Sequence, residues 1–163
     1  MTTPRSELLR QQLVRNFDSL ELTREQRAPL YDTRSGRLST GTAAAKLGAS
    51  FDILAPGMRS CPYHFHHAQE EMFVIVEGRG SLRVADELLE VRAGDVVFIP
   101  PGPQYPHQFI NTSDAPMHYL SISTREQPEI CEYPDSAKYS AWAPGIRVQQ
   151  RAESNIDYWD GEP

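Results

Sequence analysis

Two histidines separated by one residue are the first sign of chemistry in this sequence. His64 and His66 flank Phe65 in the run HFH. Successive side chains of a strand face opposite sides, so both imidazoles point the same way if this run is extended. Two imidazoles on one face can reach one ion at about 2.0–2.1 Å, the usual metal–nitrogen distance. The spacing therefore favours a strand that presents a pair of metal ligands.

A carboxylate and a third histidine can complete the set. The pair Glu70–Glu71 opens the apolar run MFVIV, and His107 starts a β-rich run, HQFIN. Both faces of MFVIV are apolar, so strand alternation does not choose between the two glutamates. Three imidazoles and one carboxylate suit Fe, Mn, Ni, Co or Zn, and four protein ligands on an octahedral ion leave two positions open. We predict one divalent metal ion (Zn, Fe, Mn or Ni) that accepts a small-molecule ligand.

Short β-rich runs must position these residues. Between about residues 47 and 124 the runs are SFDIL, HFH, MFVIV, SLRVA, LLEVR, DVVFI, HQFIN and HYLSIS, separated by turn sequences such as EGRG, RAGD and PPGP. Short strands with almost no helical pattern between them predict an antiparallel barrel or jelly roll. A parallel α/β fold is disfavoured because its crossover helices have no room.

The chain length of 163 residues fits one domain. We predict a single domain over residues 1–163, with the barrel core at about 47–124, an N-terminal extension at 1–46 and a C-terminal tail at 125–163. Leucines near helical spacing predict a short helix over residues 6–14. Tyr158 and Trp159 are large aromatics that usually need burial, so we expect the tail to pack on the barrel or on a second subunit.

Residues 57–78 resemble the first motif of the cupin family. That motif has a glycine, an HxH triplet, a glutamate, six intervening residues and another glycine. Here it runs from Gly57 through HFH and Glu71 to Gly78. Six residues separate Gly57 from His64 where the family usually has five. This difference falls in a loop, where insertions are tolerated.

Residues 94–111 resemble the second cupin motif. It runs from Gly94 through DVVFI and PPG to His107, and three residues then precede Asn111. Four residues separate Gly102 from His107 where the family usually has two.

Together the two motifs imply an all-β cupin double-stranded β-helix, a jelly-roll barrel. They also imply that His64, His66, Glu71 and His107 bind the metal, because the spacing to Gly78 selects Glu71 over Glu70. The tail runs YPDS and YWDGE resemble a group of small bacterial cupins that are sometimes labelled sugar phosphate isomerases.

Several residues near the motifs are candidates for a ligand pocket. Phe73 and Phe109 each lie two residues after a predicted metal ligand, so both should face the interior and form an apolar wall. The other pocket candidates are Tyr63, Tyr105, His118 and Arg59. Each has a plainer alternative: a core aromatic, a hydrogen-bonded core histidine, or a solvated surface charge.

Two classes of function follow from this site. In a metal-dependent isomerase or lyase the ion would polarise a carbonyl, and Glu71 or a bound hydroxide would move a proton. In a dioxygenase, substrate and oxygen would occupy two adjacent positions on iron. A non-catalytic binding or sensing protein would instead use the metal to hold its structure or a ligand. Isolated arginines weaken the isomerase hypothesis, since a sugar phosphate demands convergent basic groups.

Composition and charge limit the classes of molecule that this protein is expected to bind. The formal net charge is −6 and basic residues are scattered, which disfavours nucleic acid and anionic membrane surfaces. A polar start, and the absence of any apolar run near the roughly 18 residues of a membrane span, predict a cytoplasmic protein. Cys61 and Cys131 are expected to be reduced thiols. An open barrel edge and the apolar face formed by Met72, Val74 and Val76 predict a homodimer.

Overall fold

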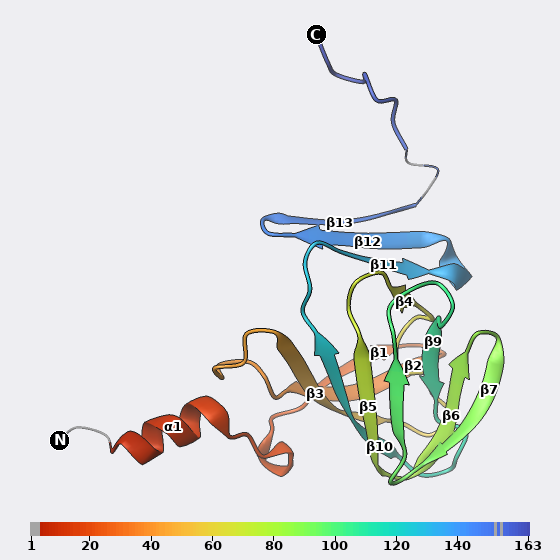
Figure 1. Ribbon diagram of the computed structural model, residues 1–163. Coiled ribbons are helices and arrows are strands. Elements are labelled where there is room, and N and C mark those ends of the chain that lie inside the picture. Colours follow the sequence, from red (N-terminus) through yellow and green to blue (C-terminus); the bar gives the residue numbers. More distant parts are fainter. Residues whose placement is uncertain (1–3, 152, 154) are drawn as a thin grey trace.

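The computed structural model describes residues 4–151, 153 and 155–163. Two antiparallel sheets form a jelly roll and a third lies across one end, at the top of Figure 1. The largest sheet has six strands, in the order β1 (Thr23–Arg27), β2 (Tyr31–Arg37), β3 (Leu47–Leu54), β10 (Met117–Thr124), β5 (Glu71–Glu77) and β8 (Val96–Ile99). The second has the order β7 (Glu87–Arg92), β6 (Arg79–Val84) and β9 (His107–Ile110). The third has the order β13 (Ile146–Arg151), β12 (Lys138–Ala143), β11 (Glu129–Tyr133) and β4 (Phe65–His66).

The predicted all-β jelly roll is confirmed. Each of the eight runs between residues 47 and 124 contains a strand. In β5 the side chains of Glu71, Phe73 and Ile75 are buried, whereas Met72 and Val74 are only partly covered. This alternation is the period of two expected for a strand with one face on the core. The interior face of β5 is therefore the one that begins with Glu71.

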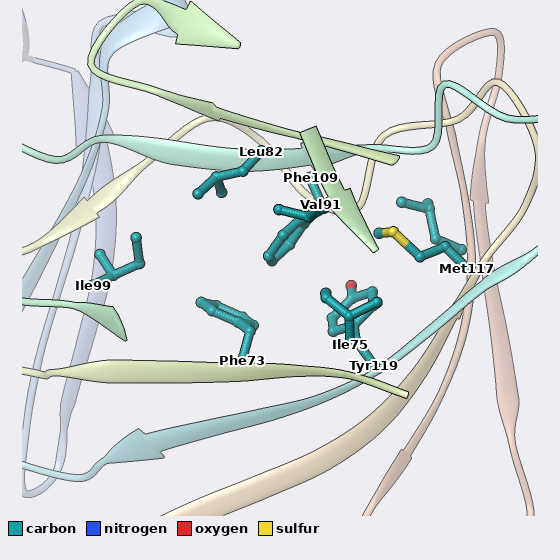
Figure 2. Packing of buried hydrophobic residues seen from close by; sticks show 9 residues of the cluster. Phe73, Ile75, Leu82, Val91, Ile99, Phe109, Met117 and Tyr119 are labelled. Carbon is teal, nitrogen blue, oxygen red and sulfur yellow. The ribbon is translucent and has the colours of Figure 1, made fainter. Parts of the chain in front are cut away.

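The core lies between the six-stranded and three-stranded sheets. Figure 2 shows side chains from both sheets meeting there. The buried cluster consists of Leu54, Phe73, Ile75, Leu82, Val91, Ile99, Phe109, Met117 and Tyr119. The ring centroids of Phe73 and Phe109 are 5.0 Å apart in an edge-on arrangement, a geometry that adds to the gain from burial. These two rings tie β5 to β9, the strands that begin with Glu71 and His107.

Both extensions contribute strands that were not predicted. The N-terminal extension adds β1 and β2 to the six-stranded sheet, and the tail forms β11, β12 and β13. Two short 3-10 helices, Phe17–Ser19 and Pro134–Ser136, also lie in the extensions. The helix predicted over residues 6–14 is present as α1 (Arg5–Leu13), with no buried residue. The first three residues of the N-terminal extension lie outside the described part.

The end of the tail does not pack on the barrel as expected. Tyr158 and Trp159 are 83% and 70% exposed, and their rings contact each other edge-on. The chain leaves β13 and runs away from the barrel in Figure 1. The expectation that these two aromatics pack on the chain's own barrel is therefore wrong. The second subunit stays a prediction, as does the homodimer, for which β8 supplies an open edge that carries the 66% exposed Phe98.

Over the described residues, no helix has the length and apolar character needed to span a bilayer.

Asn111, the last residue of the second motif, fastens a turn. Its Nδ2 donates to the carbonyls of Leu54 (3.0 Å) and Ala115 (2.8 Å). Its Oδ1 accepts from the backbone amide and the hydroxyl of Ser113, at 3.0 and 2.7 Å. The side chain is fully buried, so removing it leaves these groups without their partner. The role of this motif residue is structural.

We therefore expect Asn111→Ala to lower the free energy of unfolding by about 2–4 kcal/mol, because buried polar groups lose their partners. Urea denaturation followed by circular dichroism measures the change. The control is Asp114→Ala, an exposed position in the same turn, for which we expect a change within about 0.5 kcal/mol. Equal effects of the two substitutions would contradict this account.

Candidate metal centre

The four predicted ligands come from the ends of strands in all three sheets. His66 ends β4, Glu71 begins β5 and His107 begins β9. His64 lies just before β4 and is held by a pair of backbone hydrogen bonds with His107. The His64 amide donates to the His107 carbonyl at 3.2 Å, and the His107 amide donates to the His64 carbonyl at 2.8 Å. This bridge brings the first motif and the second motif together.

The three imidazoles converge on one carboxylate oxygen. Glu71 Oε2 lies 2.9 Å from His107 Nε2, 3.6 Å from His66 Nε2 and 3.9 Å from His64 Nε2. Glu71 and His107 are buried, with 8% and 1% of their surface exposed. His64, Glu71 and His107 form a group whose potential ligand atoms all lie within 4.8 Å of one another. The structure thus brings all four predicted ligands together at one point.

Two atoms at this point fit a bound cation. Glu71 Oε2 and His107 Nε2 are buried without a hydrogen-bond partner among the described residues, even though they are only 2.9 Å apart. Glu71 Oε2 and His107 Nε2 are close, but they are not aligned as the acceptor and donor of a hydrogen bond. A buried unpaired polar atom is costly, and such atoms are rare in native proteins. A divalent ion that accepts electron pairs from both atoms would satisfy them, and the donor set of nitrogen and oxygen is suited to such an ion.

The protonation states also suit a metal site. Burial alone would raise the pKa of Glu71, but the imidazoles around it, His107 foremost, outweigh burial and the net shift of the pKa is downward. Burial lowers the pKa of His66, against the opposing effect of nearby carboxylates. An ionised carboxylate and a neutral imidazole are the forms that bind metal ions.

Glu129, which was not predicted from the sequence, contacts His66 on the ring nitrogen that faces away from Glu71. Its carboxylate is buried on β11 with Oε1 3.3 Å from His66 Nδ1. The same carboxylate accepts hydrogen bonds from the backbone amides of His67 (3.0 Å), Ala68 (3.1 Å) and Gln69 (2.7 Å). A carboxylate on the outer nitrogen of a ligating histidine fixes the orientation of its ring. The alternation of the tail run EICEY is the signal that could have indicated a strand with Glu129 and Cys131 on one face.

An inner cavity of about 220 Å³ opens beside the ligands. It is lined by Ser50, Asp52, Ser60, Cys61, His64, Glu71, Phe73, His107, Phe109, Tyr119 and Ser121. Phe73 and Phe109 supply its apolar wall, at the positions that the sequence predicted. Apart from the predicted ligands, the rest of the wall consists of serines, an aspartate, a cysteine and a tyrosine, and it therefore suits a ligand with hydroxyl or carbonyl groups.

Asp52 is a titratable group of this cavity that the sequence analysis did not find. It lies on β3, and its Oδ2 accepts a hydrogen bond of 2.6 Å from the Ser50 hydroxyl. Burial raises the pKa of Asp52 to about 6, in spite of the opposing effects of Ser50 and of the Arg37 charge. A carboxyl group with a pKa near neutrality can both accept and return a proton under physiological conditions.

A larger outer cavity of about 690 Å³ adjoins the inner one, with which it shares Ser50 and Ser121. Its wall includes Gln69, Trp142 and other residues of the loops and of the tail sheet. The Trp142 ring lies edge-on to His66, with centroids 6.3 Å apart. The tail sheet therefore borders both the metal ligands and the outer cavity.

Four residues expected in the pocket lie away from the inner cavity. Tyr63 is buried beneath Arg83, whose guanidinium lies 3.7 Å from the ring centroid, and its hydroxyl accepts from the backbone amide of Asp86. Tyr105 is 45% exposed and borders a shallow outer hollow near Phe98. Both tyrosines are therefore packing or surface residues, which corrects the expectation that they line the pocket.

His118 and Arg59 are also corrected. In β10 it is Tyr119 and Ser121 that line the cavity, whereas His118 faces the other side, 3.1 Å from Glu77. The pairing of β10 with β3 is regular, so side chains alternate along β10. The face that points inward is the one with Met117, Tyr119 and Ser121, and not the face with His118. Arg59 lies in the loop after β3 and is absent from the residues that line the inner cavity.

Both cysteines are free thiols, as predicted. Cys61 lines the inner cavity, and burial raises its pKa. Cys131 forms a second group of possible ligand atoms with His64 and His66. Burial raises the pKa of Cys131 to about 12, so its thiol is protonated. The thiolate is the form that binds metals, which makes the set containing Glu71 the better candidate.

Comparison with known proteins agrees with the motifs. A family profile described as a cupin domain matches residues 50–123. The chain is 37% identical over 73 residues to an uncharacterized protein of Methanocaldococcus jannaschii, a match that covers 42% of this chain and 57% of that protein. The chain therefore spans little more than half the length of this curated relative.

Solved structures show the same architecture beyond the matched domain. A sugar phosphate isomerase from the cupin superfamily of Silicibacter pomeroyi has a TM-score of 0.76 and 25% identity, covering 89% of this chain and 96% of that one. A structure from Acidithiobacillus ferrooxidans has a TM-score of 0.76 over 96% of this chain and 95% of that one, and its 18% identity bears on the fold alone. The barrel, the motif residues and these similarities agree: the chain contains a cupin domain at residues 50–123.

Proposed function

We propose that the protein is a metal-dependent enzyme of the isomerase or lyase type that acts on a small hydroxy-carbonyl compound. The observation that carries this proposal is Asp52, a titratable carboxyl outside the ligand set that lines the same cavity as Glu71. A metal that served structure alone would need neither a cavity nor a proton carrier beside it. The likeness to a sugar phosphate isomerase of Silicibacter pomeroyi supports the same class of reaction.

His64, His66, Glu71 and His107 would hold the divalent ion. When bound, the ion would polarise a carbonyl group and so make the neighbouring C–H more acidic. Glu71, the proton carrier expected from the sequence, is engaged as a ligand in this arrangement. Its lowered pKa also makes it a weaker base than Asp52.

Asp52 then moves the proton. Its carboxylate, ionised above a pH of about 6, accepts the proton from the hydroxyl-bearing carbon and returns it to the former carbonyl carbon. The hydroxyl proton passes to the former carbonyl oxygen. One carbonyl and one hydroxyl exchange places, with no atom gained or lost. Ser50 keeps the base oriented through its 2.6 Å hydrogen bond.

The remaining wall of the cavity orients the substrate. Hydroxyl groups of Ser60, Tyr119 and Ser121 can exchange hydrogen bonds with those of a sugar-like compound. Phe73 and Phe109 exclude water from the reacting carbons. The cavity of about 220 Å³ is smaller than the roughly 300–1,000 Å³ of sites for drug-sized ligands, so it suits the reacting end of a molecule rather than the whole.

Removing one ligand should abolish metal binding. We expect His66→Ala to lower the affinity for Zn²⁺ or Mn²⁺ by more than about 100-fold, since loss of an outer partner alone costs about 10–100-fold. Competition titration against a chelator, together with elemental analysis, measures the effect. The matched control is His67→Ala, because His67 faces away and is paired with Glu132 at 2.7 Å. Equal metal content in both variants would contradict the assigned ligand set.

Glu129 is proposed as a positioning residue for His66. We expect Glu129→Gln to lower the affinity for Co²⁺ by about 10–100-fold and to shift the visible spectrum of the Co²⁺ complex, because the ring of His66 loses its charged partner. Glu132→Gln is the control, because this side chain lies on the same strand and is about half exposed. A Glu129→Gln protein that is less stable to heat but keeps the affinity and spectrum would show that Glu129 only holds its loop.

The proton carrier can be tested by isotope exchange. In D₂O, the metal-loaded protein should exchange the C–H next to the carbonyl of small hydroxy-aldehydes, hydroxy-ketones or their phosphate esters, observed by proton NMR. We expect Asp52→Asn to slow this exchange by about 100-fold or more while metal affinity is kept. Full exchange by the variant would overturn the role of Asp52. Ligand binding without any exchange by the wild-type protein would favour the non-catalytic binding module.

Stability provides a check that the Asp52→Asn protein is folded. The pKa of Asp52 is about 6 when folded against an ordinary value of 3.8, so the folded state holds this proton more tightly. Its contribution to stability is complete below pH 3.8 and is lost as the pH rises through 6. In chelator-treated samples above that pH we expect Asp52→Asn to be more stable than wild type by about 1–3 kcal/mol, allowing for the partial exposure of the side chain. The gain should shrink as the pH falls toward 4.

A further inference from the structure

Three arginines that are isolated in the sequence line the outer cavity together. They are Arg37 at the end of β2, Arg125 after β10, and Arg147 on β13. No acidic residue is among the described residues that line this cavity, although the chain carries a formal net charge of −6. The described residues also give none of the three arginines an ion pair. The outer cavity is therefore a local concentration of positive charge in an acidic protein.

Local packing directs Arg125 toward this cavity. Gly48, on the neighbouring strand β3, leaves room for it: a Cβ there would lie 3.3 Å from Arg125 Nε and 3.2 Å from Ser123 Oγ. Arg125 Nη2 also donates to Ser39 Oγ at 3.3 Å. Gly48, Ser123 and Arg125 all line the cavity. The Arg125 guanidinium thus lies in the space beside Gly48 and donates one hydrogen bond to Ser39. Its other N–H groups remain able to donate to a ligand.

The inner and outer cavities adjoin, so one elongated molecule could occupy both. They share Ser50 and Ser121, and the charge of Arg37 acts on Asp52 in the inner cavity. Gln69 and Gln127 add amide groups to the outer wall, and Trp142 adds an aromatic face. A molecule with its carbonyl end at Glu71 and Asp52 would therefore place its other end among the arginines.

We propose that the outer cavity binds the phosphate group of a phosphorylated substrate through Arg37, Arg125 and Arg147. Guanidinium groups form paired hydrogen bonds with phosphate oxygens, and three of them match a group that carries nearly two negative charges. This inference rests on the proposed function, since it names the class of substrate for the same site. It also removes the objection that basic groups do not converge.

The position of the arginines in the chain supports a specific role. All three lie outside residues 50–123, the part that matches the cupin family. The metal ligands and the apolar wall lie within it. The family barrel thus supplies the reacting centre, and the two extensions supply the group that recognises the substrate.

A binding experiment with a matched pair of probes tests the proposal. Ribose 5-phosphate, ribose and inorganic phosphate are titrated into metal-loaded protein and, separately, into chelator-treated protein, by calorimetry at low ionic strength. We expect ribose 5-phosphate to bind at least about tenfold more tightly than ribose, and more tightly than inorganic phosphate. Arg37→Gln and Arg147→Gln should each lower this preference by about tenfold, as expected for a charge-assisted contact. Added NaCl should weaken it.

Arg92→Gln is the matched control, because it removes the same charge from an exposed position on β7. It should leave the preference for the phosphate ester unchanged. Equal affinities for ribose and ribose 5-phosphate would overturn the subsite, as would an equal loss in Arg92→Gln. The chelator-treated sample separates the two proposals: a phosphate preference that depends on the arginines without metal keeps the subsite even if the isotope exchange fails.

Discussion

The burial of one carboxylate among three imidazoles is the interaction on which the functional part of this structure depends. An ionised Glu71 inside the barrel is costly unless positive charge or hydrogen-bond donors surround it. The sequence supplies the imidazoles of His66 and His107 from two sheets and that of His64 from just before β4, and the geometry leaves Glu71 Oε2 and His107 Nε2 unpaired among the described residues. Such a centre is stable when a cation completes it. The cavity, the positioning carboxylate of Glu129 and the phenylalanine wall are arranged around that requirement.

Strand order and ligand identity could be predicted because they are local in sequence. Turn residues separate the eight runs of the barrel, and motif spacing selects Glu71 over Glu70. The outermost strands of the two extensions, β1 and β13, carry no comparable signal. All residues of β1 and β13 are exposed, so no alternation of apolar and polar side chains marks them. Their structure comes from pairing with neighbouring strands, which is a tertiary effect.

Side-chain direction and convergence were harder to predict. Both faces of β10 carry apolar and polar side chains, so the sequence does not mark which face points inward, and His118 was expected on the wrong one. Asp52 lies in an ordinary strand run, SFDIL, where a polar residue is expected to face water. Glu129 and the three cavity arginines lie far from the motifs in sequence. Their contribution to the site exists only once the two extensions fold onto the barrel.

The pairing of β4 with β11 has a consequence for how such a protein can change. Phe65 and His66 form their ladder with Glu132 and Cys131, so the strand that carries the proposed metal ligand His66 is completed by the tail. A chain that stopped at residue 124 would retain every motif residue but would lose this partner strand and the Glu129 anchor. The barrel is therefore not a module that can be separated from the tail. The proposed metal centre and the appended segment are joined in one sheet, so we expect an exchange of tails between relatives to alter metal affinity and substrate choice together.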